Sequence, residues 1–183
     1  MLPTMDRGIG MKRGVARVAG LAILTLGLAG CFRPLYGPTA SGEPLGLLLA
    51  GIEVAPVEAV QGQERLGHFL RSELIFDLDG SGQASPRRYR LLLSSNERVQ
   101  TAIVSSITGR AESATLVGSV SYKLQTLDGR LVTDGVAQAS ATYDRSVQRY
   151  ASVRAARDAE IRVAKQLSEQ IKIRLASILS SQR

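Results

Sequence analysis

The clearest structural pattern in the chain is the stretch SATLVGSVSYKLQT, residues 113–126, in which apolar and small polar residues alternate. Successive side chains of a β-strand point to opposite faces of a sheet, so this alternation predicts a strand. One face would carry Leu116, Gly118, Val120, Tyr122 and Leu124, and the other Thr115, Val117, Ser119, Ser121 and Lys123. We therefore expect a sheet with one face that is exposed or lies against something other than its own core.

The segments on either side extend this strand into an antiparallel sheet. Asp128-Gly129 follows it and is a strong signal for a two-residue hairpin. The hairpin leads to a predicted strand at 131–143, in which Val136 is the main apolar residue among small ones. A further strand is predicted at 88–99, and 101–112 is expected to be an extended connection or a strand edge.

Two helices are predicted from apolar residues that recur at helical spacing. The first covers 61–78, and the second, at 147–180, has the apolar stripe Val153, Ala156, Ala159, Val163, Leu167, Ile171, Leu175 and Ile178. A first strand is expected from Leu47 to Val57, stopping at Pro56. This order predicts an α+β fold with two helices packed on one face of a four-stranded, mainly antiparallel sheet.

The amino-terminal segment has the three parts of an export signal. Lys12, Arg13 and Arg17 form a basic region, and the uncharged apolar run 18–28 follows. That run is too short to span a bilayer, which takes about 20 residues. The run ends in Leu28-Ala29-Gly30-Cys31, which looks like the lipobox cut by the lipoprotein signal peptidase. A buried structural cysteine is the alternative, but the position of this only cysteine directly after the apolar run favours the lipobox.

The predicted mature chain therefore begins at Cys31, after removal of the signal peptide at 1–30. Cys31 would carry a diacylglyceryl group on its sulfur and a fatty acyl chain such as palmitate on its amino group, and no other cofactor is expected. More than one acyl chain makes membrane attachment stable. By resemblance to lipoprotein sorting in Gram-negative bacteria, Phe32 in place of Asp favours the outer membrane, with the protein facing the periplasm.

Composition divides the mature chain into an extended tether and one domain. Residues 31–46 are rich in Pro and Gly and predict a tether without regular structure, and 47–183 has the size of a single domain. The signal peptide holds four basic residues and one acidic residue, so its removal lowers the formal net charge from +7 to +4. No cysteine remains for a disulfide, so the fold must be stabilised by an aliphatic core or by a partner.

No catalytic or metal-binding constellation is found in the sequence, and we do not expect an enzyme. His68 is the only histidine and lies in an apolar-periodic helix, where packing or surface exposure is the usual role. A zinc site needs several Cys or His ligands. Glu43, Glu53 and Glu58 near the first strand are interpreted as isolated, solvated carboxylates.

Two groups of basic residues are candidates for binding an anion. Arg87, Arg88 and Arg90 open the second strand, and Arg145, Arg149 and Arg154 precede or begin the long helix. Cations oppose the dipole at a helix start, so the second group is mildly unfavourable for folding and could be kept for a ligand. The alternative is a solvated basic surface. A nucleic-acid partner is not expected in the periplasm, where anionic lipid headgroups are available.

The start of the mature chain resembles one family in particular. Gly30-Cys31-Phe32-Arg33-Pro34-Leu35-Tyr36-Gly37 is similar to the start of the lipopolysaccharide-assembly lipoprotein family LptE in its alphaproteobacterial form. This sequence lacks the Gly that often follows the Cys directly in that family. The order of predicted elements agrees with the family's architecture over nearly all of the mature chain.

The resemblance implies a function and partners. LptE-family lipoproteins sit as a plug in the lumen of the outer-membrane β-barrel LptD, help assemble it and help deliver lipopolysaccharide to the outer leaflet. They are also thought to bind lipopolysaccharide through basic residues. No local motif transfers those positions, so Arg110, Arg145 and Arg149 are chosen here by regional correspondence alone.

Two other functions stay open at this point. An auxiliary lipoprotein of a phospholipid-transport ABC system would also combine a lipobox with a small α/β domain, although the Phe-Arg-Pro-Leu-Tyr-Gly segment argues against it. A lipid-anchored hydrolase is disfavoured because no catalytic triad is found.

Overall fold

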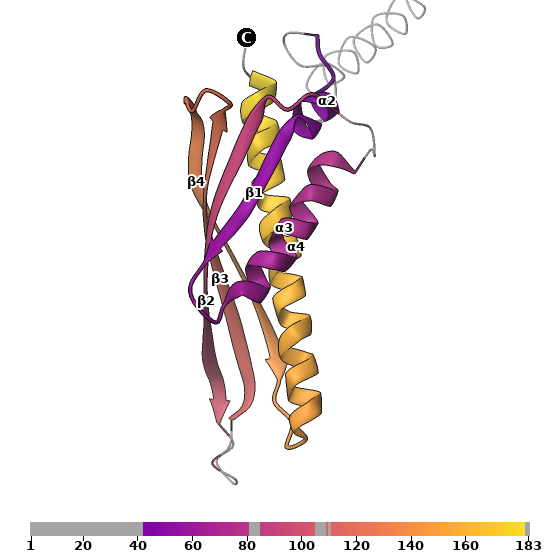
Figure 1. Cartoon of the computed structure of the whole chain (residues 1–183). Coiled ribbons are helices and arrows are strands. Elements are labelled where there is room, and N and C mark those ends of the chain that lie inside the picture. Colours follow the sequence, from indigo (N-terminus) through magenta and orange to yellow (C-terminus); the bar gives the residue numbers. More distant parts are fainter. Residues whose placement is uncertain (1–41, 81–84, 105–108, 110, 182–183) are drawn as a thin grey trace, which may run out of the picture. The chain divides into compact units, whose positions relative to one another are not determined.

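The computed structural model describes residues 42–80, 85–104, 109 and 111–181. These residues form three helices and four strands, coloured along the chain in Figure 1. In chain order the elements are α2 (Leu45–Ala50), β1 (Ile52–Ala59), α3 (Glu64–Asp79), β2 (Tyr89–Val104), β3 (Ala111–Thr126), β4 (Leu131–Asp144) and α4 (Arg149–Ser181).

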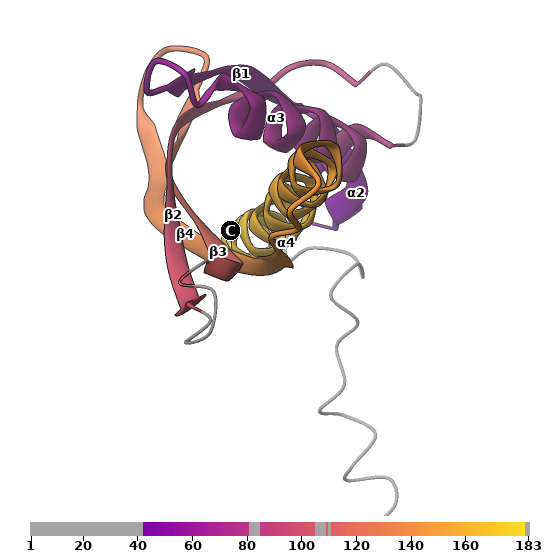
Figure 2. The ribbon, with the colours of Figure 1, turned by 90° about the horizontal axis from the view of Figure 1, so that it is seen from below.

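The four strands form one sheet in the order β1-β2-β3-β4. β1 runs parallel to β2, with α3 as the crossover between them, and the β2–β3 and β3–β4 pairs are antiparallel. The sheet curves around α3 and α4, which lie on the same side of it (Figure 2). The predicted α+β fold, with helices on one face of a mainly antiparallel sheet, is confirmed.

The alternation in 113–126 gives β3 the two faces that the sequence predicts. Leu116, Val120, Tyr122 and Leu124 are buried on the helix side, whereas Ser121 is exposed on the other. A Cβ added at Gly118 would lie 2.7 Å from Val163 Cγ1, so the glycine allows α4 to approach the sheet closely. The core is aliphatic, as expected.

The hairpin predicted between β3 and β4 is present, but its loop is longer than two residues. The Thr126 N–H donates to the Arg130 carbonyl at 2.9 Å, which closes the loop around Leu127, Asp128 and Gly129. Gly129 has a φ of 88°. A three-residue loop that ends in a left-handed glycine is a common hairpin connection, and the Asp-Gly pair fits it as well as it fits a two-residue turn.

The predicted start of the first strand was wrong. Leu45 and Gly46, expected in the tether, and Leu47 to Ala50, expected in the strand, form the short helix α2, and Leu45 is fully buried. A short apolar run has no period that separates a helix from a strand. The first strand also continues through Pro56 to Ala59, because an irregularity in its register between Val54 and Val57 accommodates the proline.

The other strands are longer than predicted at one end of the sheet. Residues 101–104, interpreted as part of an extended connection, belong to β2, and β3 begins at Ala111. Val136 is not the core residue of β4: it lies on the outer face with 52% of its surface exposed, and the neighbouring Ala137 is fully buried. Small alanines fill the inner face of β4 because α4 lies close to it.

The apolar stripe of α4 is confirmed from Ala159 to Leu175 and wrong at its start. Val153 is 52% exposed, and Ile178 is only half-buried whereas Leu179 is buried. In Figure 1 the first turns of α4 extend beyond the start of α3. Because α3 does not lie beside these turns, no neighbouring helix covers Val153.

Candidate functional site

The residues that the structure describes hold no candidate metal centre, since no group of three or more His, Cys, Asp or Glu side chains could hold an ion among them. His68 is exposed on α3, edge-on to the Phe69 ring at a centroid distance of 6.0 Å. None of the described helices combines the length and apolarity needed to cross a membrane. The features that suggest a function are therefore surfaces.

The first surface is the side of the sheet opposite the helices, here called the outer face. It carries small polar residues along β2, β3 and β4, and Thr115 and Thr142 are hydrogen-bonded across two strands at 2.9 Å between their hydroxyls. Its charges are of both signs. The basic residues are Arg90, Arg98 and Lys123, and the acidic residues are Glu53, Glu58, Asp134 and Asp144.

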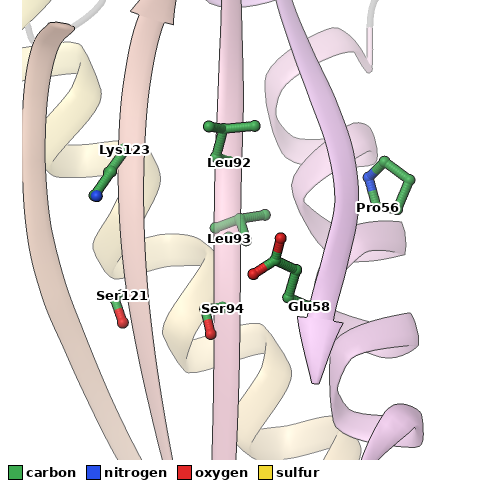
Figure 3. Close-up of a pocket in the computed structure, with 7 residues that line it drawn as sticks. All are labelled: Pro56, Glu58, Leu92, Leu93, Ser94, Ser121 and Lys123. Carbon is green, nitrogen blue, oxygen red and sulfur yellow. The ribbon is translucent and has the colours of Figure 1, made fainter. Parts of the chain in front are cut away.

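A shallow hollow of about 370 Å³ interrupts the outer face between β1 and β3. Figure 3 shows the seven residues that line it: Pro56, Glu58, Leu92, Leu93, Ser94, Ser121 and Lys123. Leu92 is the exposed apolar residue among them. The single carboxylate and single ammonium group among its lining residues do not make an anion or cation site.

The arginines that open β2 are neutralised by neighbouring groups. Arg87 lies 3.3 Å from Asp79 and donates to the carbonyl oxygens of Ala50 and Ile52, while Arg88 lies 2.8 Å from Glu43. Arg90 lies 3.2 Å from Glu53. Glu43 and Glu53 are therefore not the isolated carboxylates we expected. The pKa of Arg88 is raised, chiefly by its hydrogen bond to Glu43, and this group is structural rather than a free anion site.

The second surface is the segment 145–157, here called the α4 tip. It contains four arginines (Arg145, Arg149, Arg154 and Arg157) and no acidic residue. All four are exposed, and no ion pair involving them is found in the part of the chain that the structure describes. The first turn of α4 also lacks an acid that would offset the helix dipole. These cations are thus available to an anion.

Backbone and serine hydrogen bonds hold the α4 tip in place. The Arg145 N–H donates to the Glu112 carbonyl at 2.8 Å, which ties the end of β4 to the start of β3. The Ser152 hydroxyl accepts from the Ser146 N–H at 2.9 Å and donates to the Ser146 carbonyl at 2.8 Å. The turn that presents Arg145 and Arg149 is therefore fixed by contacts that do not involve their side chains.

Apolar side chains accompany the arginines of the α4 tip. Val147 and Tyr150 each have 76% of their surface exposed, and Val153 has 52%. Tyrosine and arginine side chains beside exposed aliphatic ones are typical of surfaces that meet the boundary between lipid headgroups and acyl chains. The α4 tip thus has the chemistry for an amphiphile with an anionic headgroup.

A charge cluster around the buried Glu160 lies between the α4 tip and the main core. The Arg65 guanidinium of α3 lies 2.7 Å from the Glu160 carboxylate of α4, whose side chain is 5% exposed. The Glu97 N–H on β2 donates to the Gln63 side chain. Burial raises the pKa of Glu97, the negative charge of Glu160 raises it further, and Arg65 opposes both effects. We interpret this cluster as structural.

The structure tests the predicted site residues only in part. Arg145 and Arg149 are brought to the same short segment, whereas Cys31 and Arg110 lie outside the described residues. Sequence reasoning missed Val147 and Tyr150, and it placed Val153 in the core. The signal that could have found them is the absence of any acid from 145 to 157 around a single tyrosine.

Comparisons with known proteins agree with this architecture. The sequence model of the family described as "LptE: Lipopolysaccharide-assembly" matches residues 49–175. A crystal structure described as a lipoprotein from Caulobacter crescentus CB15 is 30% identical, covering 75% of this chain and 97% of that one with a TM-score of 0.62. No curated protein sequence matches the chain.

Two more distant structures have a similar extent but lower similarity. The minor lipoprotein from Acinetobacter baumannii is 12% identical, with a TM-score of 0.45 and coverage of 70% of this chain and 92% of that one. The rare lipoprotein B from Shewanella oneidensis is 14% identical, with a TM-score of 0.38 and coverage of 69% and 91%. TM-scores this low add nothing to the functional argument.

Proposed function

Because the chain belongs to the lipopolysaccharide-assembly family LptE, we propose that it is an outer-membrane lipoprotein that plugs an LptD-like β-barrel. In this role it would help the barrel to assemble and help lipopolysaccharide to reach the outer leaflet. The role is structural and needs no catalytic residues. The family match favours this function over an auxiliary subunit of a phospholipid-transport ABC system.

The observation that carries the plug proposal is the outer face of the sheet. The interior of a large outer-membrane barrel is polar, and a plug needs a surface that can hydrogen-bond to it. The outer face offers the hydroxyl and amide groups of residues such as Ser94, Asn96 and Thr142, and its charges are three basic and four acidic side chains. With β2 and β3 at 16 residues each, this face extends about 50 Å along the strands.

The α4 tip is the proposed contact for lipopolysaccharide. Arg145 and Arg149, together with Arg110, would contact the phosphates of lipid A or the core sugars, since guanidinium groups bind phosphate through two parallel hydrogen bonds. The exposed Val147 and Tyr150 would face the start of the acyl chains.

The lipid on Cys31 is the proposed anchor. Between Cys31 and Pro44 an extended chain spans at most about 45 Å, so α2 must stay within that distance of the membrane surface. The α4 tip lies at the other end of a 33-residue helix, about 50 Å away along its axis. The anchored end and the proposed lipopolysaccharide-binding end would therefore be opposite ends of the domain.

The direct test is affinity purification of the tagged full-length chain from detergent-solubilised outer membranes, with mass spectrometry of the proteins recovered. We expect one LptD-like β-barrel in roughly equal amount. Cys31→Ala is the matched variant for the anchor: it should remove incorporation of radioactive fatty acid and leave the signal peptide uncut at this site. Equal labelling of the variant would contradict the lipoprotein assignment.

Recovery of an inner-membrane permease complex in place of a barrel would favour the phospholipid-transport alternative. Recovery of neither would leave the family assignment intact and remove the plug proposal. Either result would appear in the same purification, so the two functions are separated by one experiment.

A further inference from the structure

The sheet has two outer edges, and the structure protects both of them. At the β4 edge, side chains of α4 donate to backbone carbonyls of the strand: Arg162 to Thr142 at 3.0 Å, Gln170 to Gln138 at 3.0 Å, and Arg174 to Val136. These contacts occupy acceptors that another strand would need. An edge treated in this way does not pair with a further chain.

The β1 edge is protected by other means. Pro56 lacks a backbone N–H and lies at the irregularity between Val54 and Val57, and Arg87 donates to the Ile52 carbonyl at 3.2 Å. Proline and a bulge are both devices that prevent strand addition. β1 is also only 8 residues long.

A third stretch of edge exists because β2 is twice as long as β1. The pairing of β1 with β2 ends at Ala59 and Ser95, and Figure 1 shows β2 continuing beyond the end of β1. Within the described residues no strand pairs with 96–104 on the side away from β3. The stretch contains no proline and no lysine. The Gln63 side chain occupies the Glu97 N–H, and Glu97 is a charge on the helix side of the sheet, so the unprotected part of the edge begins after Glu97 and continues to the register shift after Thr101.

The direction of the free backbone groups follows from one hydrogen bond. The Glu97 N–H points away from β3 and donates to the Gln63 side chain at 2.9 Å. Alternate residues of a strand point their N–H and C=O groups the same way. Val99 and Thr101 therefore direct their backbone groups to the open side, while Arg98 and Gln100 direct theirs to β3.

The side chains beside this edge define what could pair with it. Val99 lies opposite Leu116 on the helix side of the sheet and is 55% exposed, whereas Arg98 and Gln100 are exposed on the outer face. An added strand would continue this pattern, with apolar residues on one side and polar residues on the other. That alternation is the sequence pattern of strands in outer-membrane barrels.

We propose that the open edge of β2, from Arg98 to Thr101, pairs with a β-strand of the barrel partner before the barrel closes. Main-chain hydrogen bonds would provide the affinity, as in other cases of strand addition. A closed barrel has no free strand edge, so the pairing belongs to assembly and ends when the barrel's own strands meet. The inference rests on the proposed function and adds a mechanism to it.

The chain's own tether does not suit this edge. Pro34 and Pro38 interrupt the segment that precedes α2, and proline cannot donate to a strand ladder. A second copy of the chain is the remaining occupant, and the experiment below separates it from a barrel strand.

The test compares Val99→Pro with Val99→Ala in cells that express the full-length chain. Proline removes the outward N–H at position 99, while alanine removes the side chain and keeps the N–H. We expect Val99→Pro to lower the amount of assembled barrel recovered with the tagged chain tenfold or more, and Val99→Ala to lower it less than threefold. Circular dichroism melting of each purified variant reports whether it folds.

A photo-crosslinking amino acid at position 99, with position 138 on the protected β4 edge as control, tests the contact without proline. Crosslinks from position 99 to newly made barrel that fade during a chase, and are at least fivefold weaker from position 138, support the proposal. Crosslinks between two copies of this chain overturn it, as does a barrel recovered equally with both Val99 variants and no transient crosslink. If the unmodified chain recovers no barrel at all, the proposed function itself has failed.

Discussion

The two ends of the domain use arginine in opposite ways. At the end that carries α2, Arg87, Arg88 and Arg90 each lie within 3.3 Å of a carboxylate, and large aliphatic side chains of α3 and α4 fill the space above the sheet. At the α4 tip the arginines have no such partners in the described part of the chain, and α4 lies on the sheet without α3 beside it.

Stability and ligand binding are therefore assigned to different ends of the domain. At the end that carries α2, the arginines are paired with carboxylates and the core is large, so these residues stabilise the fold. The α4 tip combines unmatched cations with exposed Val147, Tyr150 and Val153, an arrangement that contributes little to folding and suits a ligand. The predictions below test this division.

The largest effect is expected from a charge placed in the core. Ile171 is fully buried on α4, and an unpaired buried carboxylate costs several kcal/mol, a large part of the roughly 5–15 kcal/mol that stabilises a domain. Ile171→Asp should therefore unfold the purified domain or cause its degradation in cells. Leu167→Asp should do the same.

Val153→Asp is the matched control on the same helix. Because Val153 is exposed, this variant should change the free energy of unfolding by no more than about 0.5 kcal/mol. Thermal melting followed by circular dichroism measures all three variants. A cooperative melt of Ile171→Asp at the wild-type temperature would mean that the stripe of α4 is not core.

The contrast between Ile171 and Val153 also shows how far the sequence could predict this fold. The period of two in 113–126 predicted β3, and the helical period around Leu167 predicted α4. Each pattern repeats often enough to tell a strand from a helix. The period could not predict where the stripe of α4 stops being covered, since that depends on where α3 begins beside it. α2 was missed for a related reason: LGLLLA is too short to show a period.

The candidate site was predicted less completely than the fold. An arginine-rich helix start was visible in the sequence, but the ion pairs that neutralise Arg88 and Arg90 join residues far apart in the chain and could not be foreseen. The open edge of β2 depends on the unequal lengths of two paired strands, and the predicted boundary at Val99 concealed it. The sequence thus shows where the charged residues are, but only the tertiary structure shows which of them form ion pairs.

The second prediction compares the two arginine groups in binding. Arg145→Gln combined with Arg149→Gln should weaken lipopolysaccharide binding about tenfold at low salt, because hydrogen bonds to charged groups contribute about 1.5–3 kcal/mol when well formed and less when exposed. Arg88→Gln combined with Arg90→Gln removes the same number of charges and should change the affinity less than twofold.

Isothermal titration with purified lipopolysaccharide measures both pairs, and the difference should shrink as salt screens the charges. Equal losses from the two pairs would show that only the net charge matters. No loss from either would identify the arginines of the α4 tip as solvated surface.

The third prediction concerns Glu97, at the boundary between the two ends. Its pKa is raised by burial and by Glu160, so the folded protein disfavours the ionised form, and this destabilisation is present at pH values above the folded pKa. Glu97→Gln should therefore raise the melting temperature by a few degrees at pH 7. The gain should disappear as the pH falls below the ordinary glutamate pKa of 4.5, where the wild-type carboxyl is protonated in both states.

Melting curves from pH 3.5 to 8 measure this difference. Glu53→Gln is the control, since Glu53 lies in an exposed ion pair with Arg90 and exposed pairs contribute only about 0–1 kcal/mol. It should show no gain at neutral pH. A gain for Glu97→Gln that is constant across the whole range would mean that the carboxylate charge is not its cause.

The smallest expected effect is that of a substitution at the start of α4. It tests whether the arginine there is kept for a ligand or stabilises the fold. Arg149 is the first residue of α4, and no acid lies in that first turn. A cation there destabilises the helix and an anion stabilises it, by about 0.3–1 kcal/mol. Arg149→Glu should therefore raise the melting temperature by about 1–3 °C while it weakens lipopolysaccharide binding, and 1 M NaCl should remove most of the thermal gain.

A variant that gains stability and loses affinity would show that Arg149 is kept for the ligand at a cost to the fold. A loss of stability would instead mean that Arg149 belongs with the paired arginines at the other end, and the division between the two ends would have to be withdrawn.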